Sequence, residues 1–192
     1  MINFPDAEFE PILSAITEIS ANKAGPILIA IDGPAGSGKT SLASQLSNNL
    51  KSATTIHMDD LYNGWEDALT ATLTQHLNEW VINPMTQFQS VCYQKFNWST
   101  DEYGPVVEIR DIQLLILEGV GAAQEIIRQS ADLTIWIEVG PQIGLARVLN
   151  RDGDQLLPYM LKWQERESAH FLMDQTKENC QIFVDGSNTQ IK

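Results

Sequence analysis

The sequence predicts an α/β protein with a parallel sheet of about five strands and helices on both faces, and three observations indicate this fold. Short apolar runs alternate with helical patterns along the 192 residues, an order that produces parallel strands. A glycine-rich loop stands between the first such run and the helix that follows it. Acidic residues follow two further runs, where the carboxyl ends of parallel strands meet.

The elements expected in the first part of the chain follow from periodicity and turn residues. Apolar side chains recur at helical spacing over residues 6–22, and Gly25-Pro26 ends that helix. The run from Ile27 to Asp32 is apolar enough for a strand buried on both faces. Next we expect a helix over 41–50, a strand over 54–58, and a helix over 66–81 that Asn83-Pro84 stops.

The second part of the chain is expected to begin with a small β-hairpin inserted into the fold. Residues 89–97 and 105–110 alternate between apolar and polar side chains and flank Asp101-Glu102-Tyr103-Gly104, which we interpret as the turn. The remaining expected elements are strands over 114–117, 133–139 and 181–185, a helix over 141–150 that opens with Pro141, and a helix over 156–178.

The glycine-rich loop is Gly33-Pro34-Ala35-Gly36-Ser37-Gly38-Lys39-Thr40, which matches the phosphate-loop pattern G-x-x-x-x-G-K-[ST] without a mismatch. Its glycines let the backbone turn tightly and its N–H groups surround an anion, and the following helix adds its positive end. We expect residues 33–41, which include Ser41, to bind nucleotide phosphates. Lys39 should reach the β- and γ-phosphates, and the Thr40 hydroxyl should ligate Mg²⁺. The motif predicts a P-loop NTPase fold with ATP and Mg²⁺ as cofactors, while GTP as the donor stays open.

The composition of the chain argues against some classes of binding partner. The formal charge is −13 and the pI is about 4.4, which argues against nucleic acid or an anionic membrane as a partner. No apolar run is long enough to span a bilayer, and the acidic N-terminus does not resemble a signal peptide. The two cysteines, Cys92 and Cys180, lack a metal-type spacing. We expect a cytoplasmic protein that binds neither nucleic acid nor membranes, and a homodimer is left open.

Two acidic residues are expected to face the loop. Asp59 follows the predicted strand 54–58, and Glu118 follows the apolar run 114–117. Phosphoryl transfer needs Mg²⁺ ligands and a group that orients or deprotonates the nucleophile. We assign Glu118 to Mg²⁺, and Asp59 either to an acceptor hydroxyl or to Mg²⁺ through water. A helix cap or solvated turn is the plainer interpretation of the acidic pair Asp59-Asp60. For His57, a place in the core or behind the catalytic residues is more typical than catalysis.

Two arginines are candidates for the transferring phosphoryl group. Four of the twelve basic residues lie between positions 147 and 166, and among them Arg147 and Arg151 are four apart and share a helix face. Two guanidinium groups on one face suit phosphate oxygens. The alternative is solvated helix charge, paired with Asp152 or Asp154.

Aromatic residues gather between the second and third predicted strands of the sheet. On or near the hairpin they would form a stacking wall for a planar or apolar acceptor, although core packing is the better prediction for any single one. The candidates for the substrate site are Asp59, Tyr62, Tyr93, Phe96 and Trp98.

Taken together, these segments resemble the uridine kinase-like group of phosphate-loop kinases, which includes relatives acting on pantothenate, ribulose phosphate and glycerate. The resemblance runs from Ile29 to about Gly186. Its elements are the loop with Ile31-Asp32 before it, His57-Met58-Asp59-Asp60-Leu61-Tyr62, Leu117-Glu118-Gly119, and Arg147 to Asp152. The loop is specific to the superfamily, and the segment around Asp59 narrows the resemblance to this group.

The resemblance implies an ATP-dependent kinase that transfers the γ-phosphoryl group to a hydroxyl of a small molecule, with a nucleoside as one candidate. It implies that Asp59 is the base, that Tyr62 lines the acceptor site, and that Arg147 and Arg151 belong to a mobile lid.

The resemblance also implies a division of the chain. We expect one kinase domain over residues 1–192, with an acceptor-side hairpin at 88–111 and a lid region at 147–170. Phe96-Asn97-Trp98 stands where nucleoside-binding relatives carry a Tyr-Asp-Phe-like element. The difference from the Tyr-Asp-Phe-like element lies in the acceptor site, and the residues expected to bind ATP are not affected by it.

Two alternatives stay open. A nucleoside monophosphate kinase would need basic residues for the acceptor phosphate, and residues 59–110 offer only Lys95 and Arg110. The other alternative is an ATPase or nucleotide switch without a small acceptor. The chain lacks the guanine-reading Asn-Lys-x-Asp of GTPases and the Leu-Ser-Gly-Gly-Gln-like signature of transporter ATPases.

Overall fold

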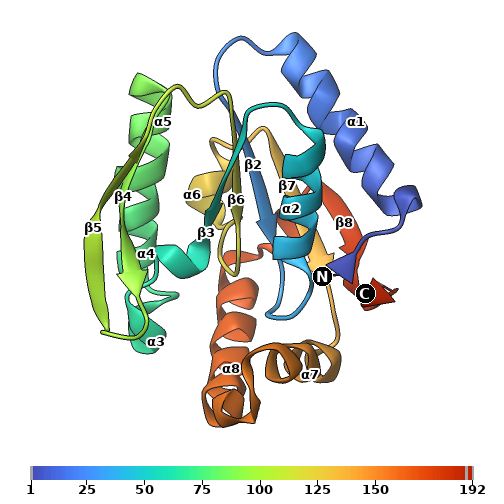
Figure 1. The fold of residues 1–192 in the computed structure, drawn as a ribbon, viewed down its shortest axis with the longest axis vertical. Helices are drawn as coiled ribbons and strands as arrows, with labels where there is room; N and C mark the ends of the chain where they lie inside the picture. Colours follow the sequence, from blue (N-terminus) through green and yellow to red (C-terminus); the bar gives the residue numbers. More distant parts are fainter. Residues whose placement is uncertain (1, 189, 192) are drawn as a thin grey trace.

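The fold is built around a parallel sheet of five strands (Figure 1). The computed structural model describes residues 2–188 and 190–191. The strands lie in the order β3-β6-β2-β7-β8. They are β2 (Ile27–Asp32), β3 (Ala53–His57), β6 (Leu114–Glu118), β7 (Leu133–Glu138) and β8 (Ile182–Asp185). The parallel α/β sheet expected from the alternating pattern is therefore confirmed.

The register of the central strands sets the position of the site. Strand β6 lies between β3 and β2, so that Glu118 is opposite His57 on one side and Ile31 on the other. The three strands therefore end at the same level. The segments that follow them begin at Gly33, Met58 and Gly119 and emerge side by side at one edge of the sheet.

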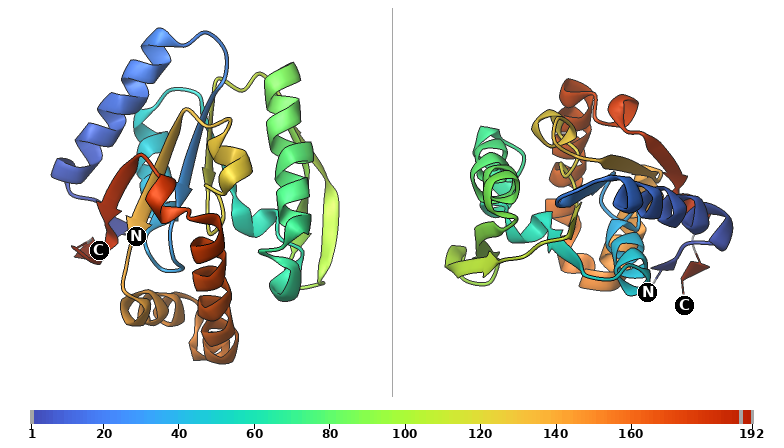
Figure 2. Two further views of the ribbon diagram at one scale, coloured as in Figure 1. Left: turned by 180° about the vertical axis from the view of Figure 1, so that it is seen from behind. Right: turned by 90° about the horizontal axis from the view of Figure 1, so that it is seen from above.

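Each face of the sheet packs against its own set of helices, because successive side chains of a strand point to opposite faces. On one face Ile29 and Ile116 pack against α1 (Asp6–Asn22) and α2 (Lys39–Asn49). On the other face Leu28 and Leu115 pack against α6 (Glu125–Arg128) and α8 (Leu157–Asp174). Figure 2 shows the arrangement of the helices around the sheet from above. Helices thus cover both faces, as predicted.

The helix expected over residues 66–81 is broken and longer, which corrects the prediction. The structure has α3 (Gly64–Asp67), α4 (Ala71–His76), a π-helical stretch Leu77–Ile82, and α5 (Asn83–Phe88). Pro84 does not stop the helix, because it lies at the first turn of α5, where a missing N–H is tolerated. The helix ends instead at Gln89, which has a left-handed φ of 52°.

The hairpin is present, but its turn lies earlier than expected. Strands β4 (Val91–Asn97) and β5 (Glu102–Ile109) are antiparallel and form a separate sheet beside α4 and α5. Glu102 pairs with Asn97, so residues 102–104 belong to the strand rather than to the turn. The chain turns at 98–101, where Asp101 takes a positive φ of 56°, a conformation that Asp tolerates better than most residues.

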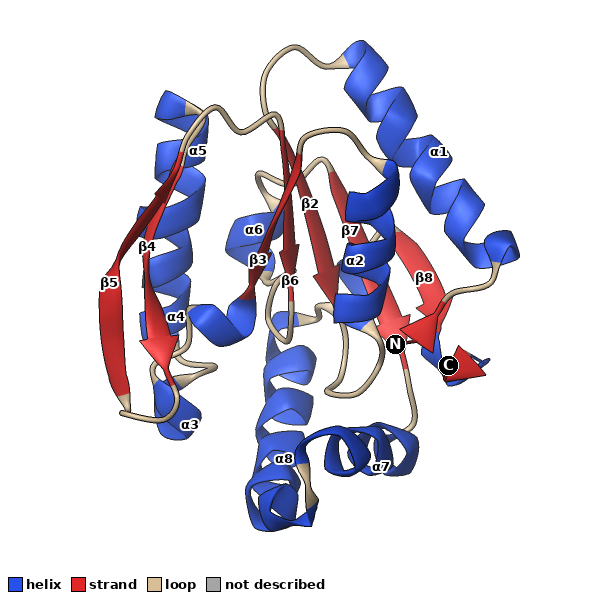
Figure 3. Ribbon diagram, viewed as in Figure 1, coloured by secondary structure: helices blue, strands red, loops and turns tan. Residues whose placement is uncertain are grey.

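Two helices lie beyond the carboxyl ends of the strands (Figure 3). Helix α7 (Pro141–Asp152) is joined to α8 through a short turn, Asp154–Leu156. Helix α8 ends at Asp174 rather than at the predicted residue 178, because Gln175 takes a left-handed φ of 51°. One pairing was not expected: β1 (Ile2–Asn3) and β9 (Gln190–Ile191) are antiparallel and bring the two ends of the chain together. No helix in the described part of the chain combines the length and apolar character needed to cross a membrane.

Candidate active site

The phosphate loop connects β2 to α2 and is wedged between β7 and α7. Gly33 and Gly36 have positive φ values of 140° and 77°. A Cβ atom on Gly33 would collide with the carbonyl of Ile137, and one on Gly36 with the carbonyl of Gly144. Only glycine fits both positions, because they combine a strained φ with close backbone contact.

The loop and the start of α2 provide the donors that a phosphate needs. A helix leaves its first N–H groups without intrahelical acceptors, and at α2 these belong to Lys39, Thr40 and Ser41. Lys39 is buried, and its Nζ donates to the carbonyls of Gly33 and Pro34 at 2.7 and 2.8 Å. The Lys39 side chain thus closes the loop on itself. The N–H groups of the loop and of the start of α2 form a cradle that suits the phosphates of a nucleoside triphosphate.

Thr40 and Glu118 come from different elements and meet beside the loop. The Thr40 hydroxyl donates to Glu118 Oε1 at 2.9 Å, and His57 Nδ1 bonds to the same carboxylate oxygen. The hydrogen bond with Glu118 raises the pKa of His57, burial opposes this, and the charges of Glu118, Asp60 and Asp59 add to it. His57 thus acts on Glu118 from the strand side.

The Thr40 and Glu118 oxygens fit a Mg²⁺ site. Among the described residues, no group of three or more His, Cys, Asp or Glu side chains surrounds a metal position. Mg²⁺ in nucleotide sites usually takes one or two carboxylates and completes its shell with phosphate oxygens and water. A hydroxyl and a carboxylate 2.9 Å apart beside a phosphate cradle match that pattern.

Asp59 lies in the short turn Met58–Asp60 that follows β3. Its side chain contacts solvent, yet protein atoms surround it on several sides. Desolvation therefore raises its pKa, the charge of Glu118 raises it further, and the charges of Lys39, Arg151 and His57 oppose the rise. Asp59 thus shares one electrostatic environment with the loop lysine and Glu118, a common mark of a functional site. Asp60 points elsewhere and pairs with Lys95 at 3.0 Å.

The two arginines of α7 have different surroundings. Arg147 donates to the carbonyls of Gly36 at 3.2 Å and Gly186 at 2.8 Å, so it ties the phosphate loop to the segment after β8. Arg151 forms a two-pronged bond with Asp152, at 2.8 and 2.7 Å. Pairing with Asp152 was the alternative that the sequence left open. Their roles toward a phosphoryl group stay predictions.

Most of the aromatic residues proposed for the acceptor site are buried. Tyr62, Tyr93 and Phe96 belong to the core, and only Trp98 is exposed, with 40% of its surface accessible. The Tyr62 hydroxyl donates to the carbonyl of Val120 at 2.7 Å. The indole N–H of Trp98 donates to the carbonyl of Asp59 at 2.9 Å. Core packing, which we rated the better prediction for each single residue, describes three of the four.

An aromatic cavity of about 320 Å³ lies between α3 and α8. The ring of Trp65 lies 5.5 Å from that of Tyr159, 5.8 Å from Trp163 and 5.3 Å from Trp98. The lining residues are Asn63, Gly64, Trp65, Glu66, Asp101, Tyr159, Lys162, Trp163 and Arg166. We call this space the α3–α8 cavity. A smaller cavity of about 220 Å³ lies at the amino end of β2, at the opposite edge of the sheet from the loop.

Three residues of α8 in this region were not predicted from the sequence. Tyr159, Trp163 and Glu167 follow one another at intervals of four residues, which places them on one face of a helix. That interval was the available signal. Glu167 is buried, and its carboxylate accepts the backbone N–H of Ala35 in the phosphate loop.

A second buried carboxylate, Asp32, joins the loop to the segment after β6. It accepts N–H bonds from Gly33, Gly121 and Ala123 at 2.7, 3.0 and 2.8 Å. Burial raises the pKa of Asp32 to about 6, against the effect of these bonds and of the Lys39 charge.

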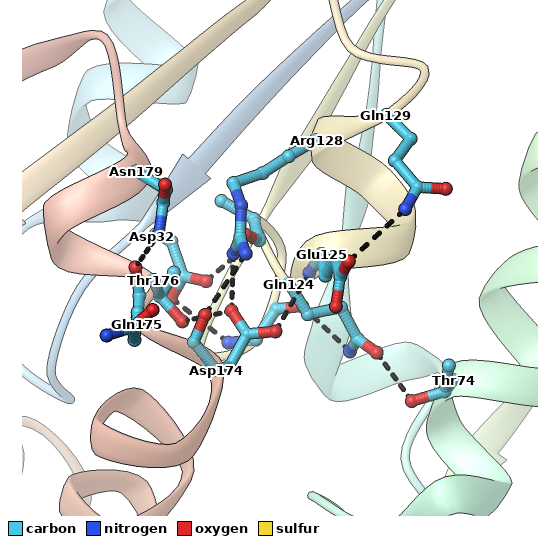
Figure 4. A network of polar contacts seen from close by, with 12 residues as sticks. Asp32, Thr74, Gln124, Glu125, Arg128, Gln129, Asp174, Gln175, Thr176 and Asn179 are labelled. Atoms are coloured by element: carbon cyan, nitrogen blue, oxygen red, sulfur yellow. Dashed lines mark hydrogen bonds and ion pairs between the residues drawn. The ribbon is translucent and has the colours of Figure 1, made fainter.

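The segment after β6 is in turn fastened to the end of α8 (Figure 4). Arg128 of α6 pairs with the carboxylate of Asp174 and also donates to the carbonyl of Ala123 at 2.7 Å. Asp174 accepts the backbone N–H of Glu125 at 2.9 Å and the hydroxyl of Thr176 at 2.7 Å. Helix α8, which lines the cavity, is thus anchored at its C-terminal end.

No family model matches the chain. Two curated uridine kinases, from strains of Ureaplasma parvum serovar 3, are each 24% identical to it over 185 residues and cover 85% of this chain and 89% of their own length. A uridine kinase of Ureaplasma urealyticum serovar 10 is 23% identical with the same coverage.

Solved structures agree on the fold. A "possible uridine kinase" from Bacillus stearothermophilus has a TM-score of 0.69 at 20% identity and covers 93% of this chain and 98% of its own. The YGR205w protein has a TM-score of 0.61 at 14% identity and covers 96% of both chains. The fold is that of an α/β P-loop NTPase, and the expected resemblance to the uridine kinase-like P-loop kinases is confirmed.

Proposed function

From this fold and this resemblance, we propose that the protein is an ATP-dependent kinase that transfers the γ-phosphoryl group to a hydroxyl of a small molecule. The observation that carries the proposal is the meeting of Lys39, Thr40 and Glu118 at the ends of neighbouring strands, with Asp59 in the same electrostatic environment. A phosphate cradle, oxygens for a metal and a free carboxylate are the parts that phosphoryl transfer requires.

The donor half of the site follows from the loop. The N–H groups at the start of α2 and the ammonium of Lys39 bind the phosphates of ATP. Thr40 and Glu118 hold Mg²⁺, which neutralises charge on the phosphates when it is bound. Arg147 keeps the loop against the segment after β8, and Arg151, whose charge reaches Asp59, stabilises the transferring group.

Asp59 is assigned as the base. A carboxylate with a raised pKa accepts a proton more readily than an ordinary one. Placed beside an acceptor hydroxyl, it takes the hydroxyl proton as the oxygen attacks the γ-phosphorus. Exposure to solvent leaves it accessible to an acceptor.

The acceptor is assigned to the α3–α8 cavity. Trp98 bonds to the backbone carbonyl of Asp59 and packs on Trp65, so one aromatic ring links the cavity wall to the segment that carries the proposed base. Tyr159 and Trp163 present further aromatic surface, which suits a planar molecule such as a nucleoside. This cavity, rather than the buried Tyr93 and Phe96, is where we expect the acceptor.

One observation favours a nucleoside monophosphate as the acceptor more than the sequence alone did. Lys162 and Arg166 line the cavity and would supply the basic groups that residues 59–110 lack. Arg166 is engaged with the carboxylate of Glu66 and the carbonyl of Trp65. Lys162 forms no ion pair with any residue in the described part of the chain and remains for an acceptor phosphate.

Acceptor-dependent release of ADP tests the proposal. Mg·ATP would be incubated with nucleosides, nucleoside monophosphates, pantothenate, glycerate and sugars, using the wild type, Asp59→Asn, and Asp60→Asn as the matched control. We expect one class of acceptor to stimulate ADP release in the wild type and in Asp60→Asn, and Asp59→Asn to slow it by about 100-fold or more. Slow hydrolysis that no acceptor changes would favour an ATPase or a nucleotide switch.

A further inference from the structure

Glu167 is a buried carboxylate to which the proposed chemistry gives no role. It lies on α8 with 3% of its surface exposed. Its Oε2 accepts the backbone N–H of Ala35, in the phosphate loop, at 2.9 Å and the indole N–H of Trp163 at 2.9 Å. Burying a carboxylate costs free energy unless it is hydrogen-bonded, so these two N–H donors indicate the role of the Glu167 side chain.

The first donor belongs to the part of the loop that Lys39 also fixes. Lys39 holds the carbonyls of Gly33 and Pro34, and Glu167 holds the next N–H, that of Ala35. Burial raises the pKa of Glu167. The bond from Ala35, the charge of Lys39 and the bond from Trp163 lower this pKa, and the charge of Asp32 raises it. Three successive residues of the loop are thus held by two side chains of opposite charge from different elements.

The second donor belongs to the wall of the α3–α8 cavity. The ring of Trp163 lies 5.5 Å from that of Tyr62 and 5.8 Å from that of Trp65. Its indole N–H points to Glu167 and its ring faces the acceptor side. One carboxylate oxygen therefore connects the cavity wall to the backbone of the phosphate loop.

We propose that Glu167 is a positioning residue that fixes the backbone of the phosphate loop at Ala35 and, through Trp163, makes the shape of that loop depend on the packing of the α3–α8 cavity. The effect on nucleotide binding rests on the proposed function, whereas the effect on the loop backbone does not. Hydrogen bonds to a charged group are stronger than neutral ones, so the loop should loosen measurably when the carboxylate is removed.

The test measures nucleotide binding and loop exchange on the same proteins. Binding of the Mg²⁺ complex of β,γ-imido-ATP is measured by calorimetry for the wild type, Glu167→Ala, Glu167→Gln, Trp163→Phe, and the double variant Glu167→Ala/Trp163→Phe. Glu165→Gln, on the exposed side of the same helix, is the matched control. Hydrogen exchange of residues 33–40 is measured without nucleotide.

We expect Glu167→Ala to weaken nucleotide binding by about 10- to 100-fold and to speed exchange in the loop, and Glu165→Gln to change neither. Glu167→Gln keeps an acceptor oxygen and the side-chain volume, so it should fold and recover most of the affinity. Trp163→Phe keeps a ring and loses the N–H, and its effect should vanish in the Glu167→Ala background, since both act through one contact.

Two results would overturn the inference. One is unchanged loop exchange and affinity in Glu167→Ala and Glu167→Gln, even with a lowered midpoint of unfolding, which would leave Glu167 a purely structural residue. The other is an effect of Trp163→Phe that adds to that of Glu167→Ala. A wild type that fails to bind the nucleotide would contradict the proposed function instead, and loop exchange would still decide the role of Glu167.

Discussion

Lys39 is buried and charged, and the loop carbonyls of Gly33 and Pro34 are its partners. The side chain is therefore in place before a nucleotide arrives, so little reorganisation is needed when phosphate charge develops. The strand, glycine loop and helix that the motif predicts are present, and the role of these residues toward a nucleotide stays a prediction.

We expect Lys39→Ala to lower the turnover of the acceptor-dependent reaction by about 100-fold or more, because a donor aimed at developing charge is lost. Steady-state release of ADP measures the change. Lys51→Ala, an exposed lysine just beyond α2, is the control and should keep full turnover. Similar rates in the wild type and Lys39→Ala would contradict the assignment of the loop.

Asp32 gives a pH-dependent prediction. Burial raises its pKa to about 6 from an ordinary value of 3.8, so the folded state binds the proton more tightly than the unfolded chain. The stability that this group contributes is full below the unfolded pKa and is lost as pH rises through about 6.

Relative to Asp32→Asn, which does not titrate, the free energy of unfolding of the wild type should fall by about 2 kcal/mol between pH 4 and pH 7. Urea denaturation at a series of pH values measures both proteins. Parallel pH profiles would contradict the prediction, because they would show that the three N–H bonds to Asp32 offset its burial and leave its pKa unshifted.

The acceptor residues mark the limit of the prediction from sequence at this scale. An aromatic residue packs equally well in a core or in a binding site, so periodicity could not separate Trp98, which is exposed, from Tyr93 and Phe96, which are buried. Four of the nine residues that line the α3–α8 cavity come from α8, more than 90 positions after Asp59 in the sequence. Only the fold shows that they belong together.

Among the elements, α7 and the phosphate loop pack with their backbones in close contact. A Cβ atom on Gly144 would lie 2.5 Å from the carbonyl oxygen of Ala35. The loop therefore depends on α7 at the residue that Glu167 also holds. Arg147, one turn further along α7, supports the same contact by bonding to Gly36.

Gly144→Ala should destabilise the protein by about 1–3 kcal/mol, because an added methyl group in a packed contact forces backbone movement. It should also weaken nucleotide binding. Gly140→Ala is the matched control, since nothing lies within 4 Å of a Cβ atom there. Urea denaturation of both variants provides the measurement, and equal effects on stability would refute a special contact between α7 and the loop.

Elements with a clear period were predicted nearly to the residue, and elements shaped by their neighbours were not. The strand at Ile27–Asp32 and the helix at Asp6–Asn22 have the predicted bounds. The segment from Gly64 to Phe88 does not, because its breaks and its π-helical stretch Leu77–Ile82 follow from packing on the hairpin and on α6. The prediction that Pro84 stops the helix was wrong, because proline is tolerated in the first turn of a helix and disrupts a helix only in its interior.

At the scale of the whole molecule, the topology of the sheet creates the site. The order β3-β6-β2 brings residues near positions 33, 59 and 118 to one edge. The alternating pattern of the sequence predicted this convergence, because parallel strands place all their carboxyl ends together. Because the chain carries a charge of −13, a phosphate at the loop would have to be held by the local donors, against the field of the whole chain.

Transfer of label from [γ-³²P]ATP tests the central claim most directly. The acceptor class that stimulates ADP release would be supplied, and the products separated to show where the label goes. The account predicts labelled acceptor in equal amount to ADP with the wild type, and almost none with Asp59→Asn although that variant still binds β,γ-imido-ATP. Label that appears only as inorganic phosphate, at a rate that no acceptor changes, would contradict the claim that this protein is a kinase.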